Sequence, residues 1–122
     1  MKQRIEEAKK ILLDNRKNGY TLPTNNKLYP AQWNWDSAFI ALGYSYFNLD
    51  YALEEMETLL AGQWDDGMVP HILFHDNDTT YFPNHTTWKC GKNIPSSGIT
   101  QPPVTVSYTH LRAHETLRYL VC

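Results

Sequence analysis

Hydrophobic and polar positions follow a helical period in two stretches of the first half of the chain. Between Lys2 and Asn18, isoleucine, alanine and leucine recur at helical spacing among charged residues, which predicts an amphipathic helix that Gly19 ends. From Asp36 to Phe47, apolar residues occupy nearly every position, and we expect a helix buried on all sides. Asp36 or Ser37 is expected to cap its first turn, because a short side-chain oxygen accepts from the free N–H groups there.

A third helical pattern, Asp50–Leu60, has only one apolar face, and Asp50 is expected to cap it and Gly62 to close it. A buried helix followed by a one-faced helix after a tight connection is typical of a double-layered helical toroid. The class predicted is therefore all-α, with too few helices to close such a ring and with an apolar face left without partners. The glutamates of this third helix are expected on its polar face: Glu54, Glu55 and Glu57.

Periodicity is lost after residue 62. Gln63–Pro83 is expected to be mostly irregular, with a short extended piece at Met68–Phe74 in which Pro70 argues against a central strand. His71, His75, Asp76 and Asp78 form a polar group within this region. It lacks the spacing of a metal site with four ligands, so a solvated loop is the favoured interpretation, and no metal is expected.

The connector before the second helix carries the chemistry that stands out. Trp33 and Trp35 are two positions apart and would project to the same side of an extended backbone. Aromatic faces stack on the C–H faces of pyranose rings, and the neighbouring Gln32 and Asp36 can bond ring hydroxyls. A sugar pocket at the N-terminal end of a helix is the hypothesis. Its opposite is that both tryptophans belong to the core and that Asp36 is only a helix cap.

Composition narrows the class of protein. The chain has 122 residues and a formal net charge of −2, which fits at most one ordinary domain and gives no basic footprint for nucleic acid. No apolar run could span a bilayer, and the N-terminal segment contains Glu6 and Glu7, so no signal peptide or membrane partner is expected and a cytoplasmic location is predicted. Cys90 and Cys122 do not make a disulfide framework.

The last seventeen residues, Val106–Cys122, read as the in-frame translation of a library adapter used in sequencing, and Thr105 lies at the junction. We therefore divide the chain into a domain portion, residues 1–104, and an added tail, residues 105–122. His110 and His114 are discarded as metal ligands for this reason.

Four motifs in order carry a resemblance: YPAQWNWDSAFIALG, LLAGQWDDGMVPHILFH, YFP and PSSGITQPPV. Together they resemble the N-terminal part of the catalytic domain of mannosylglycerate and glucosylglycerate hydrolases, which belong to glycoside hydrolase family 63 and share an (α/α)6 toroid. The resemblance implies an incomplete fragment of that toroid and an inverting mechanism, with one carboxyl group protonating the leaving oxygen and another activating water. It places both catalytic carboxylates downstream of GITQPP, so no catalytic residue is assigned here, and no cofactor is implied. The sugar-binding positions that it implies are Tyr29, Gln32, Trp33, Asn34, Trp35, Asp36, Tyr81 and Gln101.

Other functions stay open at this point. Within the same fold the activity could be that of an α-glucosidase, a trehalase or a debranching enzyme. Outside enzymes, the chain could be a carbohydrate-binding module, although helical periodicity disfavours the usual β-sandwich, or a helical scaffold whose tryptophans are enclosed without polar neighbours. The expected partner is a small glycoside or an oligosaccharide.

Overall fold

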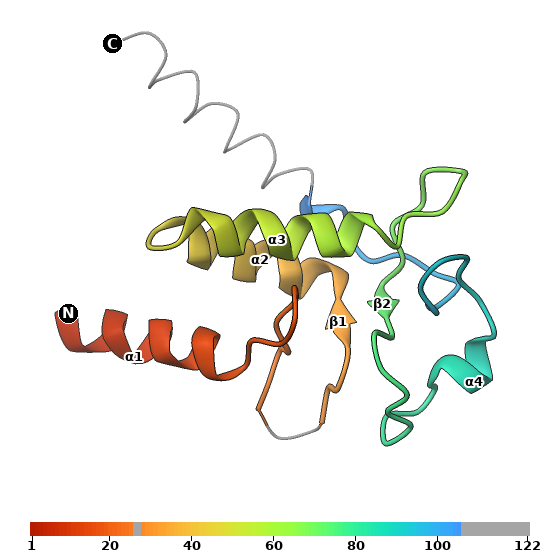
Figure 1. Ribbon diagram of the computed structural model, residues 1–122, viewed down its shortest axis with the longest axis horizontal. Coiled ribbons are helices and arrows are strands. Elements are labelled where there is room, and N and C mark those ends of the chain that lie inside the picture. The colour runs from red at the N-terminus through yellow and green to blue at the C-terminus, as the bar shows by residue number, and fades with distance from the viewer. Residues whose placement is uncertain (26–27, 106–122) are drawn as a thin grey trace, which may run out of the picture.

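The computed structural model describes residues 1–25 and 28–105. Its elements are, in chain order, α1 (Lys2–Asp14), β1 (Gln32–Trp33), α2 (Asn34–Ser45), α3 (Leu49–Leu60), β2 (Ile72–Leu73) and α4 (His85–Trp88). Figure 1 shows α2 and α3 side by side as a helical hairpin, with α1 along one side and the irregular segments on the other. The architecture is mostly helical, as the periodicity predicts.

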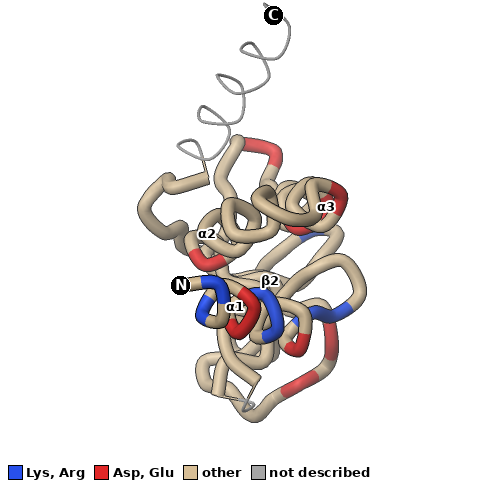
Figure 2. The backbone as a smooth tube through the Cα atoms, turned by 90° about the vertical axis from the view of Figure 1, so that its left-hand side faces the viewer, with Lys and Arg blue, Asp and Glu red and all other residues tan. Residues whose placement is uncertain are grey.

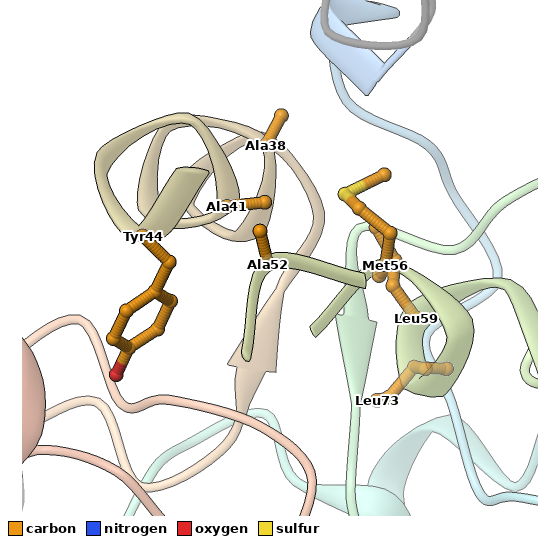
Figure 3. Packing of buried hydrophobic residues seen from close by; sticks show 7 residues of the cluster. All are labelled: Ala38, Ala41, Tyr44, Ala52, Met56, Leu59 and Leu73. Carbon is orange, nitrogen blue, oxygen red and sulfur yellow. The ribbon is translucent and has the colours of Figure 1, made fainter. Parts of the chain in front are cut away.

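The hairpin closes around small residues. Ala41 of α2 and Ala52 of α3 are both fully buried and face each other in Figure 3, which lets the two helix backbones approach closely. Leu59 fills the end of the same cluster against Leu73 of β2. Tyr44 extends from α2 toward α1, where its hydroxyl donates to the carbonyl of Leu12 at 2.8 Å. One core therefore joins the three helices and β2.

Two predicted helix starts are wrong, and so is one helix end. The second helix begins at Asn34 with Trp33 at the cap position, so neither Asp36 nor Ser37 caps it. The third is capped by Asn48, whose side chain accepts from Tyr51 N–H at 3.2 Å, two positions before Asp50, the residue expected to do so. The first helix ends at Asp14, four residues before Asn18.

The expectation that the second helix is buried on all sides is also wrong, because one side of α2 is exposed. Phe39 is 57% exposed and Tyr46 80% exposed. Helices α1 and α3 cover two sides of α2, and its remaining apolar side faces outward. This exposed face is the unpartnered surface that a fragment of a toroid is expected to leave.

The short extended piece predicted near Met68–Phe74 exists as β2, which pairs antiparallel with β1. Gln32 lies opposite Leu73 and Trp33 opposite Ile72. The next segment continues this arrangement, because Ser97 N–H bonds the carbonyl of Ile72 at 3.1 Å. The strand pair therefore fixes where β1 stops and α2 begins.

Figure 2 shows basic and acidic residues beside one another on α1. Two of its lysines pair within the helix, Lys9 with Glu6 at 2.8 Å and Lys10 with Asp14 at 2.7 Å. Within the described residues, no helix is long and apolar enough to cross a bilayer.

Candidate functional site

A cavity of about 360 Å³ opens at the N-terminal end of α2. Residues from three separate parts of the chain line it: a loop before β1, the β1–α2 junction and the segment after Ser97. The lining residues are Pro23, Thr24, Tyr29, Trp33, Trp35, Asp36 and Gln101. Five of the eight residues named from the sequence therefore meet at one concave surface.

The two tryptophans reach the cavity in different ways. Trp33 ends β1 with an extended backbone and is 7% exposed, whereas Trp35 lies in the first turn of α2 and is 44% exposed. The prediction of an extended connector between them is therefore wrong, since α2 has already begun at Asn34. Trp35 is open and has polar neighbours in Asp36 and Gln101, which is not what an enclosed core residue would show.

Aromatic edges support the floor of the cavity. The ring of Trp33 meets Tyr29 edge-on at 5.2 Å and Tyr81 edge-on at 5.1 Å between centroids. Behind it, Ile72 and Phe74 complete a small apolar cluster. Tyr81 thus contacts the site through Trp33 and is not among the residues that line the cavity. Edge-to-face packing of this kind holds the Trp33 ring in one orientation.

Asp36 supplies the negative charge of the site. Its side chain is half-buried beside the two tryptophans, and this burial raises the pKa of its carboxyl group. The adjacent N-terminus of α2 offers free backbone donors and a positive dipole end, which favour polar or anionic ligand groups. Gln101 satisfies one of these donors, because its Oε1 accepts from Trp35 N–H at 3.0 Å.

Gln32 and Asn34 do not line this cavity. Both are almost fully buried, at 0% and 2% exposure. The amide of Asn34 donates to the carbonyl of Val69 at 3.1 Å, which ties α2 to the segment before β2. Gln32 turns toward α3, where its Nε2 donates to both Glu55 Oε1 and Ser37 Oγ at 3.1 Å. The structure therefore gives these two side chains scaffold contacts rather than a place on the cavity wall.

Glu55 is the residue that the sequence reasoning misplaced. It is fully buried instead of lying on the polar face of the third helix, and Ser37 donates to its Oε1 at 2.6 Å. Burial raises its pKa, against the opposing effect of the hydrogen bond from Ser37. A signal for this was available: Glu55 follows Ala52 by three positions and precedes Leu59 by four, so it falls on the apolar stripe of the helix.

The histidines of the expected solvated loop are also part of the packed structure. His75 Nε2 lies 2.7 Å from Gln32 Oε1, and its ring stacks on Tyr20 at 4.3 Å. His71 Nδ1 lies 2.6 Å from Ser97 Oγ. Burial lowers the pKa of both imidazoles, so both favour the neutral form. The described residues contain no group of three side chains that could hold a metal ion.

Comparison with known proteins defines the class to which this fold and cavity belong. The family model for the mannosylglycerate hydrolase MGH1-like glycoside hydrolase domain matches residues 29–117. A mannosylglycerate hydrolase of Selaginella moellendorffii is 50% identical over 103 residues, covering 84% of this chain and 21% of the relative. A glucosylglycerate hydrolase of Mycolicibacterium hassiacum is 43% identical over 84 residues, covering 63% of this chain and 19% of the relative.

A solved structure agrees with both. The GH63 mannosylglycerate hydrolase from Thermus thermophilus in complex with glucose superposes with a TM-score of 0.71 at 39% identity, covering 95% of this chain and 30% of that one. The chain belongs to the MGH1-like glycoside hydrolase domain family and has the fold of part of the GH63 helical toroid. It spans about a fifth to a third of the length of these relatives.

The family match also bears on the proposed tail. It ends at residue 117 and so includes the first part of Val106–Cys122. That segment lies outside the described residues, and its origin as a translated adapter stays a prediction.

Proposed function

We propose that this chain is the substrate-binding portion of an inverting glycoside hydrolase that acts on a small α-glycoside such as mannosylglycerate or glucosylglycerate. One observation carries the proposal: Trp33, Trp35, Asp36 and Gln101 share one cavity although Trp35 and Gln101 are 66 positions apart. Family membership supports it, since the relatives are named as hydrolases of these two glycosides.

The cavity wall offers the contacts that a pyranose needs. The exposed face of Trp35 can stack on the C–H face of a sugar ring, and the carboxylate of Asp36 can accept from ring hydroxyls. Gln101 keeps an amide N–H group available, because its hydrogen bond to Trp35 uses only the carbonyl oxygen. These groups bind and orient a sugar, and tight positioning of this kind is a large part of catalysis.

Bond cleavage by inversion needs two further carboxyl groups, one as acid and one as base, on opposite sides of the glycosidic bond. We assign neither to residues 1–104. In the proposal both come from a part of the catalytic domain that follows this portion, and the reaction uses no cofactor. A cytoplasmic location is part of the same proposal and can be tested by fractionating cells that produce the protein.

The 122-residue chain, purified as it stands, is therefore expected to release no sugar from mannosylglycerate, glucosylglycerate or short α-glucosides. Its exposed α2 face should also make it bind hydrophobic dyes and aggregate.

The first measurement is to resequence the gene across Thr105 and express the complete product. Turnover by the complete product and none by the short chain supports the proposal. Turnover by the short chain would show that the acid and base have been misplaced, and inactivity of the complete product on every glycoside would refute the hydrolase function.

A further inference from the structure

Glu55 is hydrogen-bonded to both residues that flank Trp33–Asp36, the cavity segment at the start of α2. Gln32 immediately precedes Trp33–Asp36, and Ser37 immediately follows it. Both side chains bond the same carboxylate oxygen, Glu55 Oε1, at 3.1 Å and 2.6 Å. They also bond each other at 3.1 Å. A closed triangle of hydrogen bonds thus brackets the four residues that include both tryptophans and Asp36.

This triangle leaves Gln32 little freedom. Its Nε2 has a third partner in the backbone carbonyl of Glu55 at 3.1 Å, and its Oε1 accepts from His75 Nε2 at 2.7 Å. Gln32, Ser37 and Glu55 are all 0% exposed, so water does not compete for these bonds. Hydrogen bonds to both its amide N–H and its amide oxygen, in a site without water, hold the Gln32 side chain in one position. Because Gln32 directly precedes Trp33, this also fixes the backbone where Trp33 begins.

Joining α2 to α3 through the buried carboxylate of Glu55 costs free energy of desolvation. Burial raises the pKa of Glu55, and its Oε2 has no hydrogen-bond partner among the described residues. An apolar side chain of the same size would join two packed helices without this cost. The hydrogen bonds of Glu55 Oε1 go to the two residues that flank the cavity segment, which indicates that it positions that segment rather than adding stability.

We propose that Glu55 is a positioning residue for sugar binding: through Gln32 and Ser37 it fixes the orientation in which Trp33, Trp35 and Asp36 face the ligand. The inference rests on the proposed function. Glu55 itself touches no sugar. It acts as a hydrogen-bond acceptor at Oε1, so the amide oxygen of a glutamine can replace it, whereas a side chain without an acceptor cannot.

The test uses the complete gene product and glucose as the probe, with binding measured by calorimetry and folding by thermal melting. Glu55→Met keeps the length of the side chain and removes the acceptor, and it is expected to weaken glucose binding about tenfold or more, because small displacements of positioned groups cost that much. Glu55→Gln is expected to bind glucose within about twofold of the unmodified protein, since the amide oxygen of glutamine still accepts hydrogen bonds although it carries no charge. Glu57→Met, on the exposed side of the same helix, is the matched control and is expected to change nothing.

The outcomes separate the two proposals. If the unmodified protein neither binds glucose nor cleaves any of the glycosides, the proposed function fails. If it does both and Glu55→Met binds glucose equally well, the positioning role is wrong. The role is also wrong if Glu55→Gln loses as much affinity as Glu55→Met. Should Glu55→Met fail to fold, Ser37→Ala removes two sides of the triangle, the hydrogen bonds of Ser37 to Glu55 and to Gln32. An unchanged affinity in that variant would equally overturn the proposal; we expect a loss of about fivefold to a hundredfold, the value of two hydrogen bonds.

Discussion

Replacing Asp36 with asparagine is expected to lower kcat/KM of the complete gene product on mannosylglycerate or glucosylglycerate by about tenfold to a hundredfold. Asparagine keeps the shape of the side chain and one acceptor oxygen but loses the charge. A hydrogen bond to a charged group contributes about 1.5–3 kcal/mol, roughly twice the value of a neutral one. The measurement is the initial rate of sugar release at several concentrations of the substrate that the unmodified protein cleaves.

The matched control is Asp50→Asn. Asp50 occupies the first turn of α3 as Asp36 occupies the first turn of α2, but it is exposed and lies away from the cavity. Both substitutions remove a carboxylate near a helix N-terminus, so a general effect on helix dipoles would appear in both variants. Equal activity of the Asp36 variant and the unmodified protein would remove Asp36 from the binding site.

The Asp36 variant also predicts a pH dependence. Burial raises the pKa of Asp36, so its charged form is complete only at a higher pH than for an ordinary aspartate and is lost as pH falls through this raised value. The ratio of kcat/KM between the unmodified protein and the variant should therefore be largest at neutral pH and shrink toward one in acid. Because a raised pKa means that the folded state disfavours the charge, Asp36→Asn should melt no earlier than the unmodified protein at neutral pH.

Much of the helical architecture could be predicted from the sequence because apolar periodicity is a local signal. The helices expected near Lys2–Asn18, Asp36–Phe47 and Asp50–Leu60 all exist with shifted ends. The ends depend on which side chain reaches a free backbone group, and this is decided by neighbours: Asn48 rather than Asp50 accepts at α3. The strand pair involves only two residues on each side, too few for a period of two to be recognised.

The residues of the candidate site likewise fall into those recognisable from the local sequence and those placed by contacts with distant segments. Residues that project into the cavity, such as Trp35 and Asp36, have chemistry that is visible in the sequence. The destination of Gln32 is set by a residue 23 positions away, Glu55, and by His75, 43 positions away, which no local pattern indicates. The cavity also needs Gln101, whose approach to the start of α2 depends on how residues 90–99 run beside β2. Contacts between distant segments are what the sequence alone leaves undetermined.

Among the glycines of the described residues, Gly91 leaves the least room for a side chain, and it lies in the segment that leads to Gln101. Its φ of +95° is a left-handed conformation, and an added Cβ would overlap the carbonyl oxygen of Ile94 and lie 2.8 Å from Ser96 N. The turn that it makes brings Ser96 N–H to the carbonyl of Cys90 at 3.0 Å, and Ser96 in turn pairs with Leu73 of β2. From there the chain runs directly to Gln101.

Gly91→Ala is therefore expected to lower the free energy of unfolding of the complete gene product by about 2–5 kcal/mol, the sum of a left-handed backbone penalty and a steric displacement. Gly67→Ala is the matched control, because Gly67 has nearly the same φ, +92°, but its added Cβ would meet only Gln63 Nε2 at 4.0 Å. It should cost about 1–2 kcal/mol, the backbone penalty alone. Denaturant unfolding of the two variants measures the difference directly. Equal losses would mean that the backbone around Gly91 can open without cost, and the turn would then not be what holds Gln101 at the cavity.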